Sequence, residues 1–152
     1  EKSKEWARLV LPKVREKYSG DILLKFADLG PEDNFSGYDY VSFDVYWSDT
    51  NFDELRTHLS EVKRRAREYK RNFNLKGVIF GEMGAQVEEE EGWGEQSPIV
   101  GEDDQAKIMD IMFNETWGRL DGYFVSWGRR GPFSIEGRPA ESIVEGWYTK
   151  QE

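Results

Sequence analysis

The residues of this sequence that are best suited to chemistry are carboxylates, and Glu82 is the most conspicuous of them. It follows the apolar residues 78–80 and lies between Gly81 and Gly84. A simple turn at the end of a strand usually takes Asn, Asp or Gly rather than Glu. The two glycines would leave room for a ligand to approach the carboxylate closely. Glu82 is therefore either a solvated rim residue or a catalytic group, and the surrounding elements must decide between the two.

Other kinds of catalytic chemistry have little support in the composition. The chain has no cysteine, which excludes disulfides, thiolate catalysis and cysteine-based zinc sites. A Ser-His-Asp triad would depend on the single histidine, His58. This residue flanks the apolar stripe of an amphipathic helix over residues 52–72, so we expect an ordinary surface histidine.

The bulk properties predict one compact α/β domain spanning residues 1–152. Hydrophobic residues make up 38% of the chain and aromatic residues 14%, which is enough to build a core. The net charge of −9 repels phosphate backbones, so we expect no nucleic acid partner. No apolar run approaches the roughly 20 residues that span a bilayer, so we expect no membrane partner either.

Apolar segments alternate with amphipathic helices along the whole chain. Asn51 and Glu54 have the spacing of an N-cap and its capping-box partner, which predicts the start of the long helix. Alternation of this kind predicts parallel strands joined by helical crossovers. We expect strands within 21–30, 38–49, 75–84 and 121–128, and helices over 6–18, 52–72 and 109–120 and from Pro139 onward.

Four parallel strands can form a small open sheet or half of a (β/α)8 barrel (TIM barrel). The helix that opens the chain favours the half-barrel, because it reads as the partner of a preceding strand. The piece would then contain the fourth helix of the barrel, followed by strands and helices five to eight. In a half-barrel the strands follow sequence order with helices on one face only, and large apolar side chains on the other face lack cover. A doubly wound sheet would instead carry helices on both faces.

In a (β/α)8 barrel, the chemistry is carried by residues at the carboxyl ends of the strands. These ends combine carboxylates for the chemistry with flat aromatic faces that suit the apolar side of a pyranose. The residues are Asp28, Asp44, Tyr46, Trp47, Glu82 and Trp127.

Four ordered motifs resemble the C-terminal half of clan A glycoside hydrolases, most of all the β-mannanase-type family 113 and more distantly family 5. YDYVSFDVYWSD (38–49) is similar to the sixth strand, and GVIFGEMG (77–84) resembles the seventh, which carries the nucleophile. LDGYFVSWG (120–128) resembles the eighth strand with its platform tryptophan. FSIEGRPAESIVEGWY (133–148) resembles the closing segment and last helix, so the resemblance covers nearly the whole chain.

The resemblance implies a retaining glycoside hydrolase that acts on β-linked hexose oligo- or polysaccharides of the mannan or glucan type, without cofactor or metal. Glu82 would be the nucleophile, Tyr46 would donate a hydrogen bond to it, and Trp127 would form the floor of the subsite that binds the attacked sugar. The acid/base glutamate of the clan closes the fourth strand, so we expect it to be missing from this piece. Further candidates for substrate binding are Asp28, Asp44 and Trp47.

The polar segment 85–104 contains an acidic run and Trp93. Such runs are usually solvated, yet long loops are often functional, so Trp93 is a candidate for an outer sugar platform. A divalent cation on residues 88–91 is disfavoured because consecutive side chains in an extended loop point apart. Arg129 and Arg130 have two interpretations, as partners of the acidic run or of substrate hydroxyls.

We expect this piece alone to be inactive and to expose two sheet edges. Its expected partners are a carbohydrate substrate and either the missing N-terminal half of the barrel or a second copy that covers those edges. Two alternatives stay open: a non-catalytic carbohydrate-binding or structural barrel fragment, and an unrelated small α/β domain whose acidic loop recruits a protein.

Overall fold

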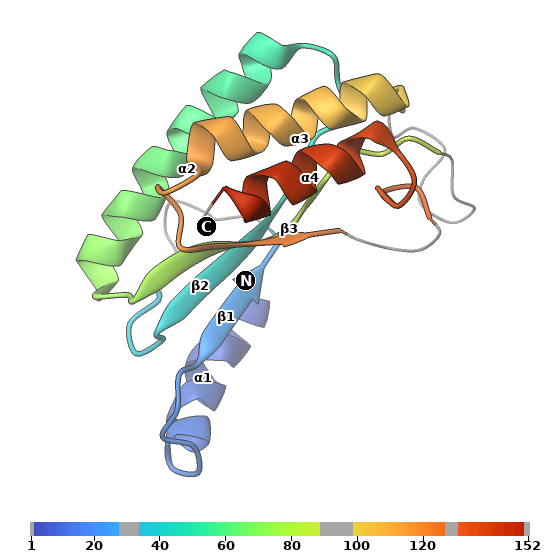
Figure 1. The fold of residues 1–152 in the computed structure, drawn as a ribbon. Helices are drawn as coiled ribbons and strands as arrows, with labels where there is room; N and C mark the ends of the chain where they lie inside the picture. Colours follow the sequence, from blue (N-terminus) through green and yellow to red (C-terminus); the bar gives the residue numbers. More distant parts are fainter. Residues whose placement is uncertain (1, 28–33, 89–98, 127–130, 151–152) are drawn as a thin grey trace.

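The fold is an α/β arrangement with four strands and four helices in the predicted order (Figure 1). The computed structural model describes residues 2–27, 34–88, 99–126 and 131–150. The elements are α1 (Lys2–Arg15), β1 (Leu23–Phe26), β2 (Tyr40–Tyr46), α2 (Phe52–Phe73), β3 (Gly77–Gly84), α3 (Glu102–Thr116), β4 (Gly122–Val125) and α4 (Pro139–Thr149).

The four strands form one parallel sheet in the sequence order β1-β2-β3-β4. The ladder between β2 and β3 is irregular at one point: Phe43 pairs with Phe80, but Asp44 pairs with Glu82. Gly81 is therefore an extra residue in β3. An extra residue changes which face the following side chains occupy, because side chains alternate between faces along a strand.

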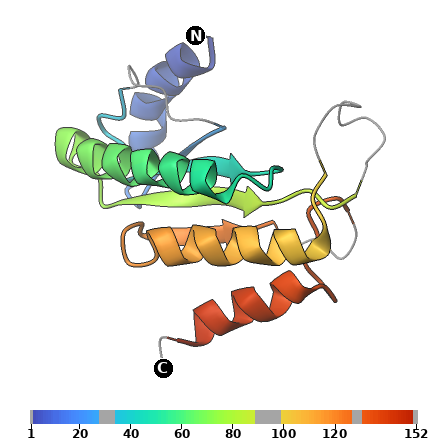
Figure 2. The same cartoon turned by 90° about the horizontal axis from the view of Figure 1, so that it is seen from above.

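One face of the sheet forms the hydrophobic core together with the helices. Val41, Phe43 and Val45 of β2 are buried there, as are Phe80 and Met83 of β3. The buried stripes of α2 and α3 belong to the same core, and both helices lie over this face (Figures 1 and 2). The opposite face consequently receives the alternate side chains of each strand.

The long helix α2 begins and ends where local chemistry allows. The Asn51 side chain accepts a hydrogen bond from the Glu54 amide at 3.2 Å, and its own amide donates to the Glu54 carboxylate at 3.1 Å. This confirms the predicted N-cap, whereas the backbone N–H of Asn51 donates to Asp49 instead of closing a capping box with Glu54. Asn74 closes the helix in the left-handed region with φ 54°, a conformation that asparagine tolerates better than most residues.

The first strand is less buried than the sequence predicts, and both edge strands carry an exposed apolar side chain. The near-continuous apolar segment 21–30 indicates a strand buried on both faces, whereas Leu23 of β1 is 42% exposed. Phe124 of β4 is 61% exposed. Both side chains lie on the face opposite to the core, because the residues next to them, Leu24 in β1 and Tyr123 in β4, pack against the core. The prediction of a fully buried first strand is wrong for this reason, and that of large apolar residues without cover is confirmed.

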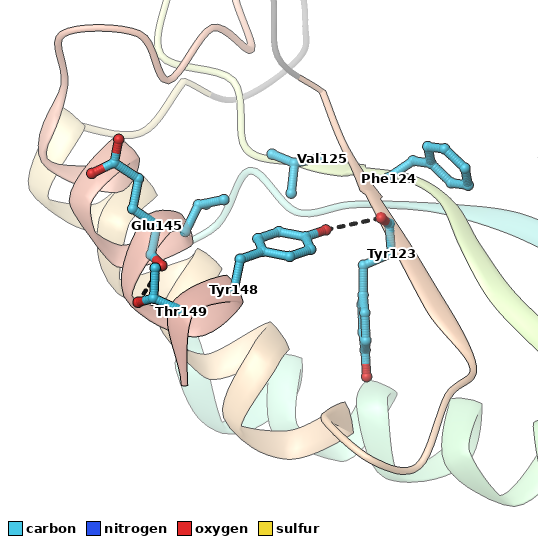
Figure 3. Close-up of a pocket in the computed structure, with 7 residues that line it drawn as sticks. Tyr123, Phe124, Val125, Glu145, Tyr148 and Thr149 are labelled. Carbon is cyan, nitrogen blue, oxygen red and sulfur yellow. Dashed lines mark hydrogen bonds between the residues drawn. The ribbon is translucent and has the colours of Figure 1, made fainter. Parts of the chain in front are cut away.

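The β4 edge carries an open apolar hollow of about 580 Å³ between the strand and α4 (Figure 3). Tyr123 and Val125 line it from the strand, and Val144 and Tyr148 line it from the helix. The Tyr148 hydroxyl donates a hydrogen bond to the Tyr123 carbonyl at 2.9 Å and so ties α4 to the edge strand. Among the described residues, no helix has the length and apolar character needed to cross a membrane.

Candidate functional site

Glu82 lies near the carboxyl end of β3, on the sheet face opposite to the core. Simple alternation would place it on the same face as Phe80, which is fully buried against the helices. The extra residue Gly81 reverses this placement and brings Glu82 beside Asp44 of β2. The irregular ladder is therefore the reason that this carboxylate reaches the open face.

Gly81 has a packing role that the sequence does not reveal. A Cβ at this position would lie 3.0 Å from the Ser42 hydroxyl oxygen and 3.1 Å from Oδ1 of Asp44. Both distances are shorter than ordinary van der Waals contacts. The space beside Gly81 is thus filled by side chains of β2, and a larger residue would push Asp44 away from Glu82.

Both oxygens of the Glu82 carboxylate have a partner on another strand, one on the adjacent β2 and one on β1 beyond it. The Tyr46 hydroxyl donates a hydrogen bond to Oε2, and the Lys25 ammonium donates one to Oε1. The Tyr46 ring is held in turn against Phe133, with ring centroids 4.7 Å apart. The hydrogen bond expected between Tyr46 and Glu82 is therefore present, and the aromatic contact fixes the direction from which it comes.

These contacts favour the ionised form of Glu82. The hydrogen bond from Lys25, followed by that from Tyr46, lowers the pKa of Glu82 below its usual range. Burial raises the pKa of Tyr46, and the hydrogen bond to Glu82 raises it further, so the phenol stays protonated as a donor. A stable carboxylate with a permanent donor beside it is suited to nucleophilic attack or to the stabilisation of a nearby positive charge.

Asp44 is the second carboxylate of the site and differs from Glu82 in its surroundings. Burial, followed by the nearby charge of Glu82, raises the pKa of Asp44 above its usual range. Its Oδ1 lies 3.4 Å from Nζ of Lys25 but accepts no hydrogen bond from the described residues. The Ser42 hydroxyl beside it is buried and likewise has no hydrogen-bond partner among them. The site therefore holds polar atoms that are free to bind a ligand or water.

The structure brings three of the predicted site residues together and places Trp47 apart from them. Glu82, Tyr46 and Asp44 form one cluster. Trp47 instead packs against the core and lies beside His58 of α2, with ring centroids 5.9 Å apart. Its role in substrate binding stays a prediction. Asp28, Trp93, Trp127, Arg129 and Arg130 lie outside the described residues.

Lys25 is the site residue that the sequence interpretation missed. It is the only charged residue of β1, in a segment that reads as a buried apolar strand. Its partners Asp44 and Glu82 are 19 and 57 residues away along the chain, so no local pattern connects them. The available signal was a lone lysine in an apolar strand that neighbours strands with carboxylates. Among the described residues, no group of three or more His, Cys, Asp or Glu side chains is arranged to hold a metal ion.

Comparison with solved structures identifies the fold. A GH113 β-1,4-mannanase matches with a TM-score of 0.72 and 16% sequence identity, over 98% of this chain and 52% of the mannanase. The GH113 β-mannanase from Alicyclobacillus acidocaldarius matches with a TM-score of 0.65 and 19% identity, over 98% of this chain and 51% of that chain. A β-glucuronidase from an uncultured Clostridium species matches with a TM-score of 0.70 and 17% identity, over 98% of this chain and 30% of that chain.

The predicted fold is confirmed, and the resemblance is confirmed at the level of the fold. The chain has the fold of half of a (β/α)8 barrel, and it spans about half the length of the mannanases that it matches. No protein-family model matches the sequence, and no curated protein matches it in sequence comparison.

Proposed function

We propose that this chain is the nucleophile-bearing half of a retaining glycoside hydrolase barrel that cleaves β-linked hexose oligo- or polysaccharides. The observation that carries the proposal is the Glu82 carboxylate, which lies on the open face of the sheet with Tyr46 donating to one of its oxygens. The neighbouring folds support the substrate class, because the mannanases and glucuronidases that share them are named for β-linked sugars.

In this mechanism the ionised Glu82 attacks the anomeric carbon and the glycosidic bond breaks. The electron pair of that bond goes to the leaving oxygen, which takes a proton from a second carboxyl group about 5–5.5 Å from the nucleophile. Water then hydrolyses the glycosyl ester, with the same second group acting as base. Tyr46 fixes the attacking carboxylate, and its hydroxyl remains a donor throughout because its pKa is raised.

The second carboxyl group belongs, in this proposal, to the other half of the barrel. The open strand edges support this part of the proposal, since Phe124 and the apolar hollow beside α4 provide a surface for further strands and helices. Barrel closure would cover both edges and bring the second half across the face that carries Glu82. Activity is therefore expected only from the complete barrel.

The test is turnover of β-linked manno- and gluco-oligosaccharides by the complete barrel, with and without Glu82→Gln. We expect the variant to lose activity by orders of magnitude while keeping its fold, because the covalent route is gone. A glycoside with fluorine at C2 and a good leaving group should trap the intermediate, and mass spectrometry should then find the sugar on Glu82.

Glu68→Gln is the matched control. Glu68 lies on α2, where it pairs with Arg64 at 2.6 Å on the outer surface. This variant should retain turnover and should not change the trapped residue. Unchanged turnover of Glu82→Gln, or a sugar trapped on another residue, would refute the nucleophile assignment. Sugar binding without turnover would instead support the alternative of a non-catalytic carbohydrate-binding fragment.

A further inference from the structure

Lys25 holds a central place among the charges of the site. Its ammonium donates to Oε1 of Glu82 and lies 3.4 Å from Oδ1 of Asp44. The two carboxylates are cross-strand neighbours, and the residue of β1 that faces them is this lysine. Its side chain is 42% exposed, so it reaches across the open face rather than into the core.

Among the described residues, the side chains that face Glu82 come mainly from β1 and β2. Lys25 on β1 is the cation, and Asp44 and Tyr46 on β2 are an anion and a neutral donor. Ser126, which follows β4, contributes no charge. With both carboxylates ionised, the cluster carries one net negative charge. Without Asp44, the Lys25 ammonium would repel the positive charge that develops on the sugar in an oxocarbenium-like transition state. The negative charge of Asp44 offsets this repulsion.

We infer that Lys25 is a positioning residue that holds Glu82 in its attacking orientation. Asp44 then becomes the ion-pair partner of Lys25 once Glu82 is converted to an ester. The inference rests on the proposed function, because it takes Glu82 to be the nucleophile. When the glycosyl ester forms, Glu82 loses its negative charge and Lys25 loses a partner. Asp44 already lies within ion-pair distance, so the ammonium needs only a small movement to remain paired.

Two features of the described structure agree with this inference. Oδ1 of Asp44 is buried yet accepts no hydrogen bond from the described residues, which suits an acceptor that is filled during only part of a catalytic cycle. The absence of a Cβ at Gly81 leaves the room that this oxygen occupies beside β3. A carboxylate that served only to stabilise the fold would be expected to have its oxygens satisfied.

The first test is a carboxyl ¹³C NMR titration of Glu82 and Asp44 in the 152-residue chain. In the unaltered chain, Glu82 should titrate below the usual glutamate range and Asp44 above the usual aspartate range. Lys25→Met should move both midpoints upward, because each carboxylate loses a nearby positive charge. Lys25→Arg should keep both close to their original values.

Lys76→Met is the matched control for the loss of a lysine ion pair elsewhere in the sheet. Lys76 pairs with Asp21 and with Asp39, at the opposite end of the strands. This variant should leave the titrations of Glu82 and Asp44 unchanged. If Glu82 titrates identically in the unaltered chain and in Lys25→Met, the inference is wrong. If the variant fails to fold, the unaltered chain alone tests the inference, which is wrong if Glu82 does not titrate below the usual glutamate range.

The second test uses the complete barrel. Lys25→Met should lower kcat by about tenfold with little change in KM, because it removes a charge-assisted hydrogen bond to the nucleophile. The acidic limb of its kcat/KM profile should move to higher pH, and Lys25→Arg should restore most of the activity. An equal loss in both variants, with an unmoved acidic limb, would show that Lys25 is only structural. The titration does not depend on turnover, so failure of this inference is distinguishable from failure of the nucleophile assignment.

Discussion

The two ends of the sheet carry charged clusters of opposite character. The amino-end cluster consists of Arg15, Asp21, Asp39 and Lys76, and the carboxyl-end cluster consists of Lys25, Asp44, Tyr46 and Glu82. At the amino end, Asp39 immediately precedes β2, and each of its oxygens has a partner. Oδ2 accepts hydrogen bonds from Arg15 and from the Ile22 amide at 2.9 Å, and Oδ1 lies 3.1 Å from Nζ of Lys76.

Arg15 extends this network to the backbone. It donates to the carbonyls of Gly20 at 2.8 Å and Gly37 at 2.9 Å, so the amino-end cluster joins α1 to the segments before β1 and β2. The carboxyl-end cluster is less saturated, because Asp44 and Ser42 each have a side-chain oxygen without a hydrogen-bond partner in the part of the chain that the structure describes. Saturated polar groups stabilise a fold, whereas open ones are available to a ligand. The contrast agrees with the division of a (β/α)8 barrel into a stabilising amino-terminal face and a chemical carboxyl-terminal face.

The first prediction compares the effect on kcat of one substitution in each cluster. Tyr46→Phe in the complete barrel should lower kcat by about 10- to 100-fold, since a hydrogen bond to a charged group contributes about 1.5–3 kcal/mol. Arg15→Met should leave kcat per folded molecule unchanged while lowering the thermal unfolding midpoint. Steady-state kinetics and calorimetry on both variants measure the two effects, and a loss of kcat in Arg15→Met would break the division of roles.

The second prediction compares two aspartates at opposite ends of the strands. Asp39→Asn should lower the thermal unfolding midpoint of the 152-residue chain by several degrees at pH 7, because the Arg15 and Ile22 hydrogen bonds favour its charged form. Asp44→Asn should raise the midpoint slightly, because burial and the charge of Glu82 disfavour the charged form of Asp44. Equal destabilisation by the two substitutions would contradict the comparison.

The third prediction is a difference in pH dependence. The pKa values of Asp39 and Glu82 are lowered in the folded chain, so each contributes stability that is present above its usual pKa, near 4, and is lost as the pH falls below it. The raised pKa of Asp44 acts in the opposite direction, because the folded chain binds that proton more tightly than the unfolded chain does.

Urea unfolding between pH 3 and pH 7 should therefore show stability falling below about pH 4. The fall should be shallower in Asp39→Asn, which lacks the lowered carboxyl pKa at the amino end. It should be steeper in Asp44→Asn, because the opposing contribution has been removed. An identical acid limb in the unaltered chain and in Asp39→Asn would show that the amino-end cluster does not control acid stability.

Local patterns in the sequence were sufficient for the elements and for part of the site. The alternation of apolar strands with amphipathic helices predicted the parallel sheet, because burial of one helix face and of the strand core depends on short-range periodicity. Asn51 predicted the start of α2 because its capping bonds are made within three residues. The hydrogen bond between Tyr46 and Glu82 was expected from a resemblance between motifs and is present in the structure.

Only the tertiary structure decided which face Glu82 occupies and what surrounds it. Strict alternation from Phe80 would have buried the carboxylate, and the extra residue Gly81 became visible only in the pairing of β3 with β2. Lys25 reaches Glu82 across 57 residues of sequence because β2 sets the strands side by side, and the register of two ladders determines that contact. Periodicity within a segment determines local structure, whereas the meeting of charges from separate strands depends on register and packing, which are properties of the whole sheet.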